Sequence, residues 1–124
     1  MKKKILIVED EKILAEMYRD RFVQAGFKVV IAYSAEDGIE ATLKEKPDLI
    51  VLDILLPREN GISFLEKLRK NPKIASTKVV AFSNYDDPAT KKEAFDLGVE
   101  EYLIKTNYTP QEITEKIKGY LSRG

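Results

Sequence analysis

Residues 49–53 read Leu-Ile-Val-Leu-Asp, and they carry the clearest signal of the fold class. Four apolar residues follow one another without alternation and stop at a carboxylate, which is typical of a strand buried on both faces. Similar apolar runs recur along the chain. They are residues 5–8, 29–32, 79–82 and 102–104. The pattern therefore predicts five strands of a parallel sheet that is covered by helices.

Amphipathic stretches follow each of these runs. Ser34 is placed to cap the second helix, and Asp87 followed by Pro88 is placed to start the fourth. Gly26 and Gly98 are placed to end the first and fourth helices. The expected core positions are Ile13, Leu14, Met17, Tyr18, Phe22, Ala35, Ile39, Leu43, Ile62, Leu65, Leu68, Ile113, Ile117, Tyr120 and Leu121. Alternating strands and helices with right-handed crossovers predict a doubly wound α/β fold with five helices.

The composition excludes several classes of protein. With 124 residues, we expect one domain over residues 1–124, without an effector domain. The chain has no Cys and no His, so disulfides, thiol nucleophiles and His-based catalysis are excluded. Its 21 basic and 21 acidic residues balance, which argues against direct nucleic-acid binding by charge. The first apolar run is too short for export or a membrane span, so we expect a cytoplasmic protein.

Polar side chains follow each of the five apolar runs, with Tyr33 and Ser34 after the second. Glu9 and Asp10 follow the first run, Asp53 the third, Ser83 the fourth and Lys105 the fifth. Ligands of open α/β sheets bind at the carboxyl ends of the strands. We therefore expect three carboxylates, a hydroxyl and an ammonium group at one edge of the sheet.

The chemistry of this edge favours a metal ion and a phosphoryl group. If the first and third strands are neighbours, Asp10 and Asp53 lie a few ångströms apart. Two like charges at 4 Å repel by about 4 kcal/mol at an effective dielectric constant near 20. A cation with oxygen ligands, such as Mg²⁺, would offset this repulsion. Phosphoryl oxygens could then be shared by the metal and the lysine.

Each of these residues also has a structural interpretation. Asp10 could cap the first helix, and Glu9 and Glu11 could be solvated acids near its start. Asp53 could form an Asx turn, while the serine could be structural and the lysine solvated. No single residue decides the matter, but their joint placement favours a functional site.

Four separated motifs resemble the receiver domain of bacterial response regulators, the phosphoacceptor part of two-component phosphorelay signalling. They are residues 5–10, residues 51–57 with Gly61, residues 81–83 and residues 102–105. The resemblance covers essentially the whole chain. It implies a flavodoxin-like fold with strand order 2-1-3-4-5.

The resemblance also implies roles at the metal and phosphoryl positions. Asp53 is similar to the family's phosphoacceptor, and Asp10 to its direct Mg²⁺ ligand. Glu9 would hold the metal through water, and the carbonyl of Leu55 would be a further ligand. Lys105 would contact a phosphoryl oxygen. The donor would be a phosphohistidine on a sensor histidine kinase or a phosphotransfer protein.

The output of such a protein is a switch. Ser83 would hydrogen-bond the phosphoryl group, so that Asp53, Lys105 and Ser83 form the catalytic set. Tyr102 would swing inward behind Ser83. The conformational change would act on a downstream effector, or on an effector domain if the chain is part of a larger regulator. Phosphorylation would also allow a dimer to form. Beyond self-phosphorylation and slow autodephosphorylation we expect no enzyme activity.

Two positions are similar to those that set the phosphate lifetime in related receivers. Leu55 lies two residues beyond Asp53, and Tyr85 lies two residues beyond Ser83. Neither side chain is suited to orienting a water, and both can obstruct its approach, which predicts a long-lived phosphorylated state. The alternative is that Leu55 packs against its loop and Tyr85 is a solvated turn residue.

Two residues depart from the family pattern. Thr106 follows the lysine where the family usually has a proline in a cis peptide bond, and a non-proline cis bond costs ~3–4 kcal/mol, so we expect a trans bond. Asn84 stands where the family usually has a small residue, and it could crowd Asp53 or contact the phosphoryl group.

Two alternative functions stay open at this point. One is a phosphohydrolase of the haloacid dehalogenase type, but such enzymes have an Asp-x-Asp pair after the first strand, whereas Leu55 lies two residues beyond Asp53. The other is an interaction module that works without phosphorylation, against which the retained acids, serine and lysine argue.

Overall fold

The computed structural model describes residues 2–122; residue 1 and residues 123–124 lie outside the described part. The strands are β1 (Lys4–Val8), β2 (Lys28–Ala32), β3 (Leu49–Leu52), β4 (Val79–Ser83) and β5 (Tyr102–Ile104). The helices are α1 (Lys12–Gln24), α2 (Ala35–Glu45), α3 (Gly61–Lys70), α4 (Pro88–Asp96) and α5 (Pro110–Ser122), with a short 3-10 turn, η1 (Lys105–Asn107). None of the described helices is long and apolar enough to span a bilayer.

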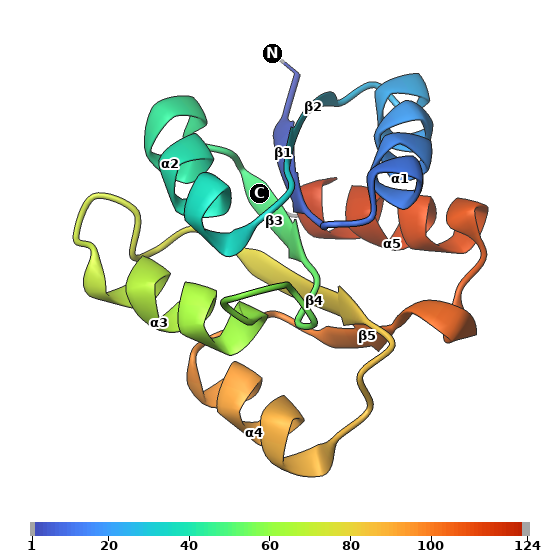
Figure 1. The fold of residues 1–124 in the computed structure, drawn as a ribbon. Helices are drawn as coiled ribbons and strands as arrows, with labels where there is room; N and C mark the ends of the chain where they lie inside the picture. Colours follow the sequence, from blue (N-terminus) through green and yellow to red (C-terminus); the bar gives the residue numbers. More distant parts are fainter. Residues whose placement is uncertain (1, 123–124) are drawn as a thin grey trace.

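The strands form one parallel sheet in the order β2-β1-β3-β4-β5 (Figure 1). This confirms the doubly wound topology. The order reverses between β1 and β3, so the crevice at the carboxyl end of the sheet opens there. The register pairs Val8 with Leu52, and the N–H of Asp53 donates to the carbonyl of Val8 over 3.0 Å. The residues that follow β1 and β3 are therefore held side by side.

The two faces of the sheet carry separate hydrophobic cores, and Figure 1 shows helices on both faces. Helices α2, α3 and α4 cover one face, where Phe64, Leu65 and Leu68 are fully buried. Helices α1 and α5 cover the other, where Phe22 and Ile117 are fully buried. Because β1, β3 and β4 are buried on both faces, their continuous apolar sequences are explained.

The expected core needs correction at two helix positions and one strand. Ile13 is 87% exposed, because α1 packs on the sheet through Ala15, Tyr18 and Phe22. Leu43 lies at the surface of α2 in the same way. Strand β2 is an edge strand, and most of its residues are only partly buried. A short apolar run in the sequence does not distinguish an edge strand from a central one.

The expected helix starts are confirmed where a side chain caps them. Ser34 accepts a hydrogen bond from the N–H of Asp37, and Asp87 accepts one from the N–H of Thr90. Helix α1 has Glu11 at its N-cap, without a side-chain hydrogen bond. Asp10 therefore does not cap this helix. The described residues contain no cis peptide bond, as expected for Lys105 and Thr106.

Arg69, near the end of α3, connects three segments that have no sheet hydrogen bonds between them. Its guanidinium donates to the carbonyls of Ala75 and Thr77 before β4, at 2.9 and 2.6 Å. It also donates to the carbonyls of Leu97 and Gly98 at the end of α4, at 2.7 and 3.2 Å. Burial lowers the pKa of Arg69. The fork of N–H donors thus ties these four carbonyls to the end of α3.

We expect Arg69→Ala to lower the free energy of unfolding by ~3 kcal/mol, because several charge-assisted hydrogen bonds are lost at once. Arg69→Lys should recover little of the loss, since one ammonium cannot reproduce the planar fork. Arg19→Ala is the control, because Arg19 pairs with the exposed Asp20, and its effect should stay within ~0.5 kcal/mol. Urea unfolding measures all three variants; equal losses for Arg69→Ala and Arg19→Ala would contradict the role of Arg69.

Candidate functional site

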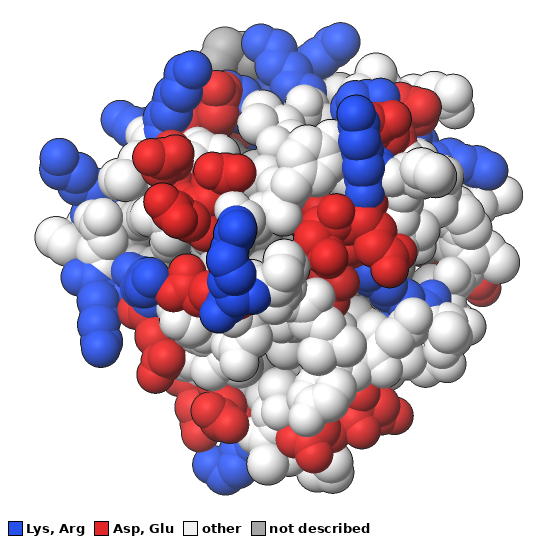
Figure 2. Space-filling view, viewed as in Figure 1, with Lys and Arg blue, Asp and Glu red and all other residues white. Residues whose placement is uncertain are grey.

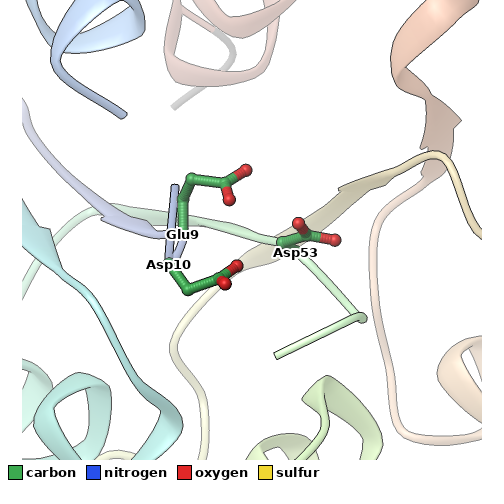
Figure 3. A group of neighbouring side chains, drawn as sticks. All are labelled: Glu9, Asp10 and Asp53. Atoms are coloured by element: carbon green, nitrogen blue, oxygen red, sulfur yellow. The ribbon is translucent and has the colours of Figure 1, made fainter. Parts of the chain in front are cut away.

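Three carboxylates meet at the carboxyl end of the sheet. Glu9 and Asp10 extend from the end of β1 toward the side of Asp53, which follows β3 (Figure 3). Each offers an oxygen atom, and these atoms lie within 4.8 Å of one another. Figure 2 shows acidic side chains gathered near the middle of this face, where β1 and β3 end in Figure 1. The expected acidic cluster is therefore present.

Lys105 compensates part of this negative charge. Its Nζ pairs with Oε1 of Glu9, and it lies 3.0 Å from Oδ2 of Asp53. The side chains of Lys105, Glu9 and Asp53 are only 11%, 4% and 9% exposed. The sequence placed this lysine at the same edge but did not predict its ion pair with Glu9. Since an unpaired charge is costly to bury, the ammonium of Lys105 stabilises the two buried carboxylates beside it.

Burial and charge act on the two partners in different ways. Burial raises the pKa of Glu9, and the hydrogen bonds from Lys105 and Glu11 offset this only in part. Burial alone would lower the pKa of Lys105, but its interactions with Glu9 and Asp53 outweigh it and raise that pKa. The lysine is therefore fully protonated near neutral pH, and a proton or a metal ion stabilises the acid cluster further.

Three of the site side chains are fixed by the backbone two residues further on. Oε2 of Glu9 accepts the N–H of Glu11 over 3.0 Å. In the same way, Oδ1 of Asp53 accepts the N–H of Leu55, and Oγ of Ser83 accepts the N–H of Tyr85, both over 3.2 Å. The Asx turn considered for Asp53 is thus real. It leaves Oδ2 to Lys105, so the turn and the functional interpretation are compatible.

The expected switch residues lie on neighbouring strands. Ser83 is fully buried at the end of β4. Tyr102, on β5, lies partly buried against the core, and its hydroxyl donates to the carbonyl of Tyr85. Burial, together with acids including Asp53 and Asp86, raises the pKa of Tyr102 to about 12. The hydroxyl therefore stays protonated and keeps its role as donor.

Gly61 permits the close approach of α3 to the acidic edge. A Cβ at this position would lie 2.8 Å from both the carbonyl oxygen of Asp53 and the Cα of Ile54. The N–H of Gly61 also donates to the carbonyl of Ile54 over 2.8 Å. Leu55 follows Ile54 directly and is 53% exposed. The loop that carries Leu55 is thus held at the mouth of the site.

One contact joins the two positions that depart from the family pattern. Oδ1 of Asn84 accepts the N–H of Thr106 over 3.0 Å. Both residues stand out in the sequence, but their contact could not be predicted from it. The only signal was that each departs from the usual residue, and that the loops after β4 and β5 are neighbours.

A family model, the response regulator receiver domain, matches residues 5–118. The chain belongs to this family. It is 31% identical to the alkaline phosphatase synthesis transcriptional regulatory protein PhoP of Bacillus subtilis (strain 168), over 99% of this chain and 50% of that protein. It is also 31% identical to the probable transcriptional regulator ycf27 of Cyanophora paradoxa, over 98% of this chain and 49% of that protein. The chain thus spans about half the length of these curated relatives.

Solved structures agree with this assignment. A CheY-like response regulator receiver domain protein from Methanospirillum hungatei JF-1 superposes with a TM-score of 0.90 at 28% identity, covering 99% of this chain and 96% of that one. A putative response regulator from Chloroflexus aurantiacus J-10-fl superposes with a TM-score of 0.86 at 29% identity, covering 98% and 99%. The chain is a receiver domain, and the phosphoacceptor switch of two-component signalling is the function of this family.

Receiver domains typically bind a divalent metal at an acidic cluster, and the donor set present here fits one. Glu9, Asp10 and Asp53 offer only oxygen ligands, which suit a hard cation. Asp10 is exposed and so leaves room for water ligands. Lys105 supplies one positive charge against three negative ones, so a divalent cation would remove the remaining repulsion.

We expect Lys105→Met to tighten Mg²⁺ binding by about tenfold, or ~1.4 kcal/mol, because the variant removes a cation that competes for Glu9 and Asp53. Lys116→Met is the matched control, since Lys116 pairs with Glu101 outside the site. Its affinity should equal that of the wild type. Isothermal titration calorimetry with MgCl₂ measures both variants; weaker binding in Lys105→Met would show that the lysine organises the metal ligands instead of competing with the ion.

Proposed function

We propose that Asp53 is the phosphoacceptor of this domain and that it works with Mg²⁺. An Oδ atom of Asp53 attacks the phosphorus of a phosphohistidine, the P–N bond breaks, and the imidazole nitrogen keeps the electron pair. Asp10 and Asp53 would hold the metal directly, with the Leu55 carbonyl, and Glu9 would act through water. The bound metal would neutralise charge on the transferring group.

Two further side chains act on the phosphoryl oxygens in this proposal. Lys105 already lies 3.0 Å from Oδ2 of Asp53, so its ammonium can pass to a phosphoryl oxygen with little movement. Ser83 accepts from Tyr85, which leaves its hydroxyl hydrogen free to donate to a second oxygen. Lys105 therefore lies beside the atom where negative charge develops during transfer, while the Ser83 hydroxyl moves toward it.

The observation that carries the proposal is that buried Asp53 lies beside Glu9, Asp10 and Lys105. Incubation with Mg²⁺ and acetyl phosphate, followed by intact-mass measurement, tests it. We expect the wild type to gain one phosphoryl group and Asp53→Asn to gain none. Asp96→Asn is the control, because Asp96 is an exposed acid of α4 paired with Lys92, and it should be modified like the wild type. Modification of Asp53→Asn would mean that another residue is the acceptor.

The partners follow from this chemistry. The donor is a sensor histidine kinase or a phosphotransfer protein, and both would act on this domain in the cytoplasm. The names of the relatives, which are transcriptional regulators, favour an output through an effector domain or a downstream effector protein. The conformational change would begin at the contacts that join Ser83, Tyr85 and Tyr102. A phosphorylation-dependent dimer is one form that the output can take.

Autodephosphorylation is slow in this proposal, because the side chains of Leu55 and Tyr85 obstruct water. Both are exposed, and the N–H of each donates to a side chain that would touch the phosphoryl group or carry it. The backbone of both residues is thus fixed next to the site, and neither side chain carries a group that could orient a water molecule.

We expect the double variant Leu55→Asn with Tyr85→Glu to lose its phosphoryl group about tenfold faster, equivalent to ~1.4 kcal/mol of barrier. The measurement is the first-order decay of phosphorylated protein after the donor is removed, at constant Mg²⁺. The control is Leu43→Asn with Phe95→Glu, which changes exposed apolar residues of α2 and α4. An unchanged decay in the first double variant would show that these side chains do not gate the water.

A further inference from the structure

The loops that follow β4 and β5 carry the two groups proposed to contact phosphoryl oxygens, Ser83 and Lys105. These loops are joined directly beyond those two residues. Oδ1 of Asn84, next to Ser83, accepts the backbone N–H of Thr106, next to Lys105, over 3.0 Å. The two partners are 22 residues apart in the sequence. The contact therefore fixes one loop against the other.

The donor in this contact is a group that its own segment cannot satisfy. Thr106 belongs to the 3-10 turn η1, in which the N–H of Tyr108 donates to the carbonyl of Lys105. The first N–H groups of a helical turn have no partner inside the turn. The Asn84 carboxamide therefore acts as a cap that comes from a different loop. It anchors η1 at its first turn, where Lys105 is the first residue.

The contact needs both of the residues that depart from the family pattern. A proline at position 106 would have no N–H to donate. A small residue such as alanine at position 84 would have no side-chain acceptor. The two departures are thus complementary, and together they supply a hydrogen bond that neither the proline nor the small residue could make.

The position of the Lys105 ammonium depends on where its backbone is held. On one side, β5 is fixed by pairing with β4, where Ile104 lies opposite Ser83. On the other side, the Asn84 contact holds Thr106. The long and flexible lysine side chain then reaches Asp53 and Glu9. A small displacement of this backbone would misplace the ammonium, and misplaced groups reduce transfer rates strongly.

We propose that Asn84 is a positioning residue for phosphoryl transfer, which holds the loop of Lys105 against the loop of Ser83 through the N–H of Thr106. This inference rests on the proposed function of Asp53. Asn84 does not touch the phosphoryl group in this proposal. It acts through the backbone of the neighbouring loop, so its loss should affect the transfer step and leave metal binding unchanged.

The test compares the wild type, Asn84→Ala and Thr106→Ala in the full chain. Thr106→Ala is the matched control, because it removes the Thr106 side chain and keeps the N–H. With Mg²⁺ and saturating acetyl phosphate, we expect Asn84→Ala to be phosphorylated about fivefold more slowly, or ~1 kcal/mol, with Thr106→Ala within twofold of the wild type. The Mg²⁺ affinity should be the same in all three proteins. Amide hydrogen exchange at residue 106 should be faster in Asn84→Ala only.

Asn84→Asp adds a rescue, since it keeps the acceptor oxygen and should restore slow exchange at residue 106. An unchanged phosphorylation rate or unchanged exchange at residue 106 in Asn84→Ala would overturn the inference alone. A faster rate would also overturn it, because Asn84 would then obstruct the pocket instead of positioning the loop. A wild-type chain that gains no phosphoryl group would overturn both this inference and the proposed function.

Discussion

The ion pairs of Lys105 with Glu9 and Asp53 are the interaction on which the site depends. The sheet order brings the ends of β1 and β3 together, and with them three carboxylates whose oxygens lie within 4.8 Å. Such a cluster is stable only with positive charge beside it. The lysine follows the edge strand β5, which lies two strands away from β3 and Asp53. The folded topology is therefore what brings this ammonium beside the three acids and forms the site.

The structural and functional interpretations of the site residues turn out to be complementary. Glu9, Asp53 and Ser83 each accept the N–H of the residue two positions on, which is the local turn bond that such side chains make in many loops. In each case this turn bond occupies one carboxylate oxygen, or one lone pair of the serine hydroxyl. The turn fixes the rotamer, and the remaining capacity points to the shared space. Local backbone chemistry thus prepares the side chains for the task, and this reduces the reorganisation needed when a ligand binds.

Much of the fold could be predicted because its signals are local. Continuous apolar runs marked the central strands, and Ser34 and Asp87 marked helix starts by capping chemistry that needs only the next turn. The misplaced core residue Ile13 shows the limit, since an apolar side chain can lie at the edge of a helix stripe without packing. The pair of Lys105 with Glu9 and the Asn84 contact with Thr106 were missed because both join distant segments, where distances are set by twist and register and not by local pattern.

A continuous set of contacts leads from the acid cluster to α4. Ser83 accepts from the N–H of Tyr85, and the carbonyl of Tyr85 accepts from the hydroxyl of Tyr102. The centroid of the Tyr102 ring lies 5.9 Å from Nζ of Lys91 in α4. The same ammonium pairs with Asp86 in the loop before that helix. A phosphoryl group that draws the Ser83 hydroxyl toward Asp53 would strain the first of these bonds. Because the later contacts share the same short loop, we expect a change there to bias the position of α4 while the sheet stays fixed.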